Sequence, residues 1–168
     1  MIKAGIFTAI ILFFSPGADA QCDILNRVYP DGSMMYSMEP VKFYWTEAKE
    51  LYGNVVTDKE NYFLALRPVP FPAKTEGKKL KGDMELILSN QQVIELSHYD
   101  TQYIMNDSIM EVMYLLNKKD IDAAHQFEAE SVKLNMGKEE GDRTYVFKLH
   151  KTAFQDQLEC FLDEEKKD

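Results

Sequence analysis

The sequence contains one short run in which two side chains suited to acid–base chemistry stand close together, His98-Tyr99-Asp100. Side chains alternate between the two faces of a β-strand, so this spacing puts His98 and Asp100 on one face with Tyr99 opposite. An imidazole beside a carboxylate is a pair that general acid–base catalysis uses. A satisfied surface pair explains the same residues, and we favour that interpretation. A small hydrolase centred on His98 and Asp100 is therefore our alternative hypothesis.

Other catalytic and metal-binding motifs are missing from the sequence. His98, His125 and His150 stand singly, without the HxH or HExxH spacing of a zinc site. The GxSxG, P-loop and dinucleotide-binding motifs are absent as well. The acidic segment 138–142 lacks the alternating oxygen ligands of a calcium loop. We therefore expect neither a metal site nor a cofactor.

The chain has two cysteines, Cys22 and Cys160. In an oxidising compartment two cysteines most simply pair, so we predict a disulfide between them. By chain-entropy reasoning, a loop of this length is worth roughly 4 to 5 kcal/mol of stability. Two free buried thiols, or a catalytic thiol, are the alternatives.

The first twenty residues have the features of a secretory signal peptide. Lys3 precedes the apolar run 4–14, and residues 18–20 form a small-x-small cleavage site. The apolar run is well short of the ~20 residues that a membrane-spanning helix needs. We expect 1–20 to be removed without membrane insertion, and the protein to be secreted or periplasmic. An uncleaved anchor and lipid modification of Cys22 are the alternatives.

The charge of the chain restricts its partners. With 19 Lys and Arg against 28 Asp and Glu, the formal net charge is −9. Such a chain repels phosphate backbones and anionic lipid, so we expect no nucleic-acid partner. Acidity can steer a protein towards basic proteins. We therefore expect the partner to be another protein.

The apolar pattern predicts a single β-rich domain over residues 21–162, followed by a charged tail at 163–168. A central hairpin at 84–103, with Met84, Leu86 and Leu88 on one face, organises the domain. Further strands are expected at 24–29, 41–45, 62–66, 111–116, 131–136 and 144–149. Short helices are expected at 46–52 and 119–124, and a C-terminal amphipathic helix at 151–162. The fold class is mainly β, a β-sandwich or partly open barrel.

Two segments are candidates for contact with a partner. Strand 41–45 ends in three consecutive aromatic residues, so at least one ring is exposed or covered by another layer. Residues 67–72 include three prolines, which lack backbone donors, so we expect this run to be extended and outside the sheet. Core packing and a stiff crossover are the structural explanations that we favour. The candidate contact residues are Tyr44, Trp45, Pro68, Pro70, Phe71 and Pro72.

The segment 81–149 resembles exported β-sandwich proteins of unknown function from Bacteroidetes-type bacteria. The resemblance depends on a hairpin with an Asn-containing turn at 87–96, a short helix at 120–124 and a strand pair at 131–136 and 144–149. This sequence has Gln91 where a glycine is usual after the turn Asn. The resemblance implies a small sandwich and supplies no activity. Our functional hypothesis is an exported, non-catalytic protein-binding domain, such as a periplasmic immunity or inhibitor protein.

Overall fold

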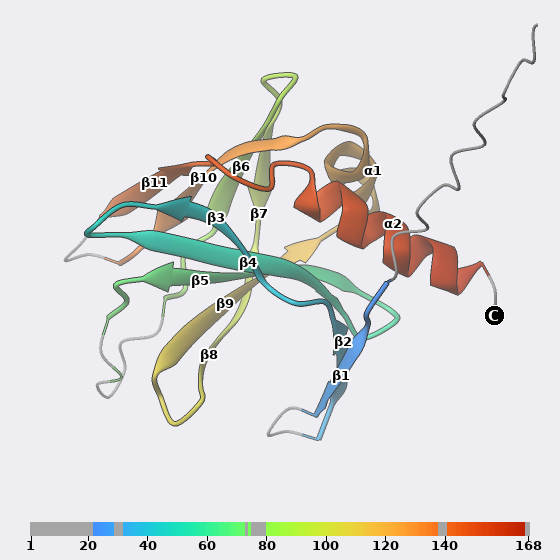
Figure 1. The fold of residues 1–168 in the computed structure, drawn as a ribbon, viewed down its shortest axis with the longest axis horizontal. Helices are drawn as coiled ribbons and strands as arrows, with labels where there is room; N and C mark the ends of the chain where they lie inside the picture. Colours follow the sequence, from blue (N-terminus) through green and yellow to red (C-terminus); the bar gives the residue numbers. More distant parts are fainter. Residues whose placement is uncertain (1–21, 29–31, 73, 75–79, 138–140, 167–168) are drawn as a thin grey trace, which may run out of the picture.

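The computed structural model describes residues 22–28, 32–72, 74, 80–137 and 141–166. These residues form a mainly β fold with two helices, as the sequence predicted (Figure 1). The predicted signal peptide at 1–20 lies outside the described residues, as do residues 138–140 of the charged turn.

The larger sheet has seven antiparallel strands. Its order is β1-β2-β4-β5-β9-β8, and β3 pairs with β4 beside this path. Strand β4 therefore has two neighbours on one side, because β3 pairs with its first half and β2 with its second half. The bounds are β1 Leu25–Val28, β2 Met34–Ser37, β3 Val41–Trp45, β4 Glu50–Thr57, β5 Tyr62–Val69, β8 His98–Ile104 and β9 Ile109–Leu116.

The smaller sheet has four antiparallel strands in the order β11-β10-β6-β7. Its bounds are β6 Met84–Leu88, β7 Val93–Leu96, β10 Ala129–Asn135 and β11 Asp142–Val146. Helix α1 (Lys118–Gln126) connects β9 to β10, and helix α2 (Ala153–Glu165) follows β11. Figure 1 shows α2 lying beside the two sheets, with α1 next to it.

The two sheets meet at both of their sides. At one side, only Ser97 separates β7 from β8, and the Leu115 amide donates to the Ser97 carbonyl at 3.0 Å. At the other side, the Lys148 amide, just after β11, donates to the carbonyl of Phe43 in β3 at 2.9 Å. The result is a partly open barrel, one of the two architectures that the sequence predicted.

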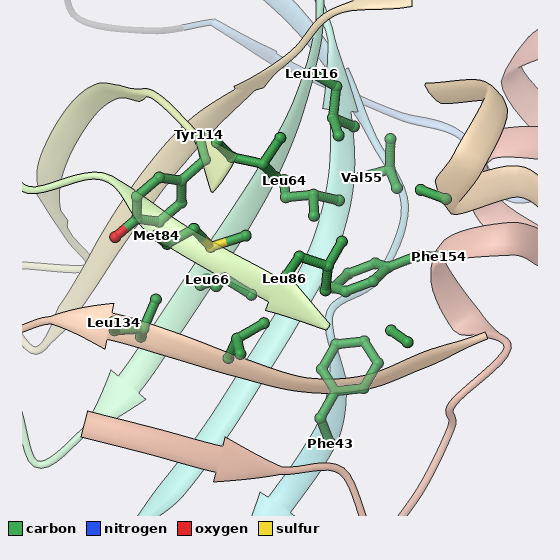
Figure 2. Close-up of a cluster of buried hydrophobic side chains, with 14 of the residues drawn as sticks. Phe43, Val55, Leu64, Leu66, Met84, Leu86, Tyr114, Leu116, Leu134 and Phe154 are labelled. Atoms are coloured by element: carbon green, nitrogen blue, oxygen red, sulfur yellow. The ribbon is translucent and has the colours of Figure 1, made fainter. Parts of the chain in front are cut away.

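The main core lies between the sheets and α2 (Figure 2). Met84, Leu86 and Leu88 all point into it, as their alternation predicted. The Phe43 ring from β3 packs against the Phe154 ring from α2, with 4.6 Å between the ring centroids. Burial of these side chains is the main force that joins the two sheets.

The outer face of the seven-stranded sheet carries a second, smaller cluster. Its members are Met35, Val56, Phe63, Ala65 and Met113. Arg27 of β1 reaches Glu111 of β9 on this face at 2.9 Å, although three strands lie between β1 and β9. In a flat sheet these strands would be about 19 Å apart. The sheet therefore curls, and the β1–β2 hairpin folds over the second cluster.

The prediction of a short helix at 46–52 is wrong. Residues 46–49 form a tight turn, in which the Thr46 amide donates to the Lys49 carbonyl at 2.7 Å, and β4 begins at Glu50. Gly53, directly after the predicted helix, is a strand residue where an added Cβ would lie 2.6 Å from Leu66 Cδ2. A helix this short gains too few hydrogen bonds to compete with strand pairing.

The Pro-rich run enters the sheet further than expected. Strand β5 continues to Val69, and Pro68 pairs with Leu51 of β4. The described pairing between β5 and β9 ends earlier, at Leu66 and Val112. Pro68 thus lies beyond the doubly paired part of β5, where a missing amide is easiest to tolerate.

Other elements also differ from the sequence prediction. The central hairpin 84–103 is divided, because β6 and β7 form the hairpin while β8 belongs to the other sheet. Helix α1 begins at Lys118 rather than at residue 119; Asn117 caps it, and Asp120 is the third helical residue of the capping box. Helix α2 continues to Glu165, so the beginning of the predicted tail at 163–168 is helical.

Candidate functional site

The candidate catalytic pair is split by an irregularity in β8. In the register with β9, His98 pairs with Tyr114 and Asp100 pairs with Met113, so Tyr99 is an extra residue. Such a β-bulge reverses the alternation of side chains. His98 therefore shares the core-facing side of the sheet with Tyr114, while Asp100 shares the outer face with Met113. The expectation that His98 and Asp100 lie on one face is wrong.

The His98 ring is hydrogen-bonded to a buried hydroxyl. Its Nε2 lies 2.8 Å from Thr101 Oγ1, and that hydroxyl donates to the Leu80 carbonyl at 2.7 Å. Because a hydroxyl has a single proton to donate, the imidazole must donate from Nε2 to Thr101. His98 is thus not arranged to take a proton from this hydroxyl.

Asp100 makes local hydrogen bonds on the outer face. Its Oδ1 accepts from the Thr101 amide at 2.8 Å, and its Oδ2 accepts from Gln102 Nε2 at 3.0 Å. Neither Asp100 nor His98 is among the lining residues of three cavities in the described part of the chain, of about 380, 300 and 210 Å³. The hydrogen bonds that Asp100 accepts from Thr101 and Gln102 stabilise the bulge.

The two groups of candidate contact residues meet at one end of the larger sheet. Trp45 of β3 lies opposite Glu50 of β4, and Glu50 lies opposite Val69 of β5. Partners in a register share a face of the sheet, so these three side chains form a row. Trp45 is 49% exposed and Val69 is 38% exposed. We call Trp45, Glu50 and Val69 the β3–β5 row.

Hydrogen bonds fix the carboxylate at the centre of the β3–β5 row. Lys42 Nζ donates to Glu50 Oε1 at 2.9 Å, and the Tyr52 hydroxyl donates to Glu50 Oε2 at 2.8 Å. The bond from Lys42, followed by that from Tyr52, lowers the pKa of Glu50 below its usual value. Glu50 is therefore a fixed negative charge between two exposed apolar side chains.

The three aromatic residues of β3 have different surroundings. Phe43 is fully buried, and the half-buried Tyr44 packs edge-on against Tyr145 with 5.4 Å between ring centroids. Trp45 is the exposed member. The Lys148 ammonium lies 5.0 Å from the centre of the Trp45 ring, within the range of a cation–π contact.

Most of the Pro-rich run is held by other parts of the fold. The Pro70 carbonyl accepts from Arg143 Nη1 at 2.6 Å, and the Pro72 carbonyl accepts from the Tyr103 hydroxyl at 3.0 Å. Phe71 packs against the Tyr103 ring, with 6.1 Å between centroids, and Pro68 is buried. Of the candidate residues in this run, Pro70 remains exposed beside Val69.

The predicted disulfide is present. Cys22 and Cys160 are bonded, with their Cα atoms 5.7 Å apart, and the bond joins the segment before β1 to helix α2. Within the described part of the chain, no three His, Cys, Asp or Glu side chains are grouped as a metal site would require. Likewise, none of the described helices is long and apolar enough to cross a bilayer.

An ionic cluster on the outer face was not predicted. The Glu111 side chain is 1% exposed and lies between Arg27, at 2.9 Å, and Arg67, at 2.6 Å. Glu111 stands in the apolar run 109–116, and a charge in such a run was the available signal. Its two partners lie far from it along the chain, so the sequence alone could not identify them.

Comparisons with protein-family models, with curated protein sequences and with solved structures found no match.

Proposed function

We propose that this protein is an exported, non-catalytic domain that binds another protein through the β3–β5 row. The observation that carries this proposal is the position of exposed Trp45 and Val69 on either side of Glu50. Tryptophan is enriched among the residues that dominate binding energy at interfaces. Paired strands hold the row in place, so little ordering entropy opposes binding.

The charge of the chain supports a basic partner. A net charge of −9 attracts positively charged proteins and speeds their encounter. The Lys148 ammonium lies 5.0 Å from the centre of the Trp45 ring, and a lysine or arginine of the partner would take its place there. A periplasmic immunity or inhibitor protein that neutralises a basic toxin or enzyme fits this combination.

The proposed compartment is the periplasm or the cell exterior. The predicted signal peptide at 1–20 supports export, and the Cys22–Cys160 disulfide is compatible with an oxidising environment. The alternative, a hydrolase centred on His98 and Asp100, gains no support from the contacts described above. Binding is therefore the function that we propose.

The test is capture of a partner from periplasmic extract at low salt, followed by mass spectrometry. We expect a basic protein to be retained and to be released as salt rises. Trp45→Ser and Val69→Ser should each weaken its binding, by about tenfold or more for the tryptophan. The matched control is Val93→Ser, which changes a 56% exposed valine on β7.

Two outcomes contradict this proposal. One is that no protein is retained at low salt. The other is that the captured protein binds Trp45→Ser as tightly as it binds the unchanged chain, because the β3–β5 row would then not be the contact.

A further inference from the structure

A cavity of about 300 Å³ lies between the β1–β2 hairpin, the turn after β4 and the C-terminal part of α2. Figure 1 shows these elements on the same side of the molecule. The space equals the volume of about ten waters, which suits one small ligand. Its lining includes Tyr36, Lys59, Tyr62, Phe161 and Glu164. We call it the α2–hairpin cavity.

The walls of the α2–hairpin cavity are largely aromatic. Tyr36, Tyr62 and Phe161 supply three rings, and the last two are nearly buried, at 6% and 3% exposed. The rings of Tyr62 and Phe161 meet edge-on, with 6.3 Å between centroids. Rings of this kind provide flat surfaces against which another ring packs well.

Two opposite charges line the same cavity. Lys59 and Glu164 line the cavity and are both exposed. Both charges are in contact with water before a ligand arrives, so a ligand can reach either one directly. The Lys59 ammonium lies 5.1 Å from the centre of the Tyr36 ring. The cavity therefore has an aromatic wall, one cation and one anion. A few polar groups placed in this way give a binding site its specificity, and these favour a ligand that carries both charges.

The backbone at Lys59 is held firmly. Its φ of 78° is in the left-handed region, and its amide donates to Thr57 Oγ1 at 3.0 Å. In the same turn, Asp58 Oδ1 accepts from the amides of Glu60 and Asn61 at 2.9 and 2.6 Å. The root of the lysine side chain is thus fixed, while its ammonium can turn from the Tyr36 ring to a ligand.

We propose that the α2–hairpin cavity binds a zwitterionic aromatic molecule of amino-acid size. The ligand carboxylate pairs with Lys59, its ammonium pairs with Glu164, and its ring packs against Tyr36, Tyr62 and Phe161. A simple aromatic acid would be opposed by Glu164, and a simple aromatic amine by Lys59. This site is separate from the β3–β5 row and does not depend on the proposed protein binding.

The experiment uses the disulfide-bonded protein, labelled with ¹⁵N and followed by NMR. The three probes are L-phenylalanine, 3-phenylpropionate, which lacks the ammonium, and 2-phenylethylamine, which lacks the carboxylate. We expect L-phenylalanine to shift the amides around the cavity in a saturable way and to bind more tightly than either single-charge probe.

Variants then assign each charge. Lys59→Gln should weaken the binding of L-phenylalanine and of 3-phenylpropionate by roughly two- to fivefold, as expected for a solvent-exposed ion pair. It should not weaken the binding of 2-phenylethylamine. Glu164→Gln should weaken the binding of L-phenylalanine and of 2-phenylethylamine, and leave that of 3-phenylpropionate undiminished. Both residues are exposed, so neither change endangers folding. Lys49→Gln, at an exposed lysine in the turn before β4 and away from the cavity, is the matched control and should leave the binding of all three probes unchanged.

The proposal is overturned if L-phenylalanine gives no saturable shifts at the cavity. It is also overturned if the single-charge probes bind as tightly as L-phenylalanine, or if Lys49→Gln weakens binding as much as Lys59→Gln does.

Discussion

Glu111 is a charged residue almost completely removed from water. Burying a carboxylate is costly unless cations and hydrogen bonds compensate. Arg67 supplies two hydrogen bonds to Oε2, at 2.8 and 2.6 Å, and Arg27 supplies one to Oε1, at 2.9 Å. The three residues connect β1, β5 and β9, so they hold the β1–β2 hairpin over the outer face of the sheet.

Removing this charge should destabilise the protein. We expect Glu111→Gln to lower the free energy of unfolding by roughly 2 to 3 kcal/mol, below the full penalty for a buried pair because both arginines are partly exposed. Urea denaturation measures the change. Glu95→Gln, at an exposed glutamate on β7, should stay within about 0.5 kcal/mol. Equal effects of the two substitutions would contradict the role of the cluster.

Tyr114 and Tyr145 are both fully buried, but their hydroxyls differ. Among the described residues, the Tyr114 hydroxyl has no hydrogen-bond partner, whereas the Tyr145 hydroxyl accepts from Arg143 Nη1 at 3.0 Å. Tyr114→Phe should therefore leave the free energy of unfolding unchanged or raise it by up to about 1 kcal/mol. Tyr145→Phe should lower it by roughly 0.5 to 1.5 kcal/mol. Urea denaturation of both variants decides, and the reverse order would contradict this assignment.

Burial also raises the pKa of the Tyr114 phenol above its usual value of 10.0, with a smaller contribution from Asp83. Above pH 10 the unfolded chain therefore loses this proton while the folded chain keeps it. The resulting stability is complete below pH 10 and falls by up to about 1.4 kcal/mol per pH unit above it. The free energy of unfolding of Tyr114→Phe, measured by urea denaturation at a series of alkaline pH values, should fall less steeply with pH than that of the unchanged protein. Parallel declines for both proteins would show that Tyr114 does not contribute.

At the scale of elements, α2 completes the hydrogen bonding of the larger sheet. Residues 38–40 separate β2 from β3, and the Val55 amide of β4 donates to Gln157 Oε1 of α2 at 2.7 Å. Gln157 Nε2 in turn donates to the Glu39 carbonyl at 3.3 Å. A helix side chain thus replaces the strand neighbour that β4 lacks at this position.

Gln157→Leu should leave the buried Val55 amide unpaired. We expect the free energy of unfolding to fall by about 1 to 3 kcal/mol, because a buried donor would lose its acceptor. Hydrogen exchange of the Val55 amide should become faster at the same time. Gln155→Leu is the control, since Gln155 donates to the exposed His125 carbonyl on the surface. Unchanged exchange at Val55 would contradict the role of Gln157.

The success of the sequence prediction differed between elements for physical reasons. The pattern of Phe154, Leu158 and Phe161 repeats with the helical period, and it correctly indicated α2. Strand β3 was predicted with its observed bounds, because β-branched and aromatic residues favour a pleated sheet. Residues 46–52 have helix-forming composition, yet pairing with β3 and β5 outweighs that preference.

The candidate site was harder to predict because strand alternation fails at a bulge. Nothing in the run from His98 to Asp100 indicates that Tyr99 is an extra residue, and this residue decides which face each side chain occupies. Trp45 was identified locally, whereas Val69 lies within the predicted Pro-rich run without having been a candidate itself. Their meeting in one row depends on the pairing of β3, β4 and β5, which a single sequence does not reveal.

For the whole molecule, the strongest constraint on the unfolded chain is the Cys22–Cys160 disulfide. It closes a loop with a sequence separation of 138, and it fixes the segment before β1 to α2. This prediction needed only two cysteines and an oxidising compartment, since no other pairing exists. By contrast, the way the two sheets join at Ser97 and Phe43 depends on contacts between distant residues.

Removing both cysteines tests how the disulfide stabilises the barrel. Because the loop is long, Cys22→Ser with Cys160→Ala should lower the free energy of unfolding by roughly 4 to 5 kcal/mol, mainly by freeing the unfolded chain. Urea denaturation of the variant, compared with the oxidised and reduced forms of the unchanged protein, measures this loss. The reduced form should match the variant. A loss below about 1 kcal/mol would mean that the Arg27–Glu111–Arg67 cluster and the core, rather than the disulfide, keep the β1–β2 hairpin in place.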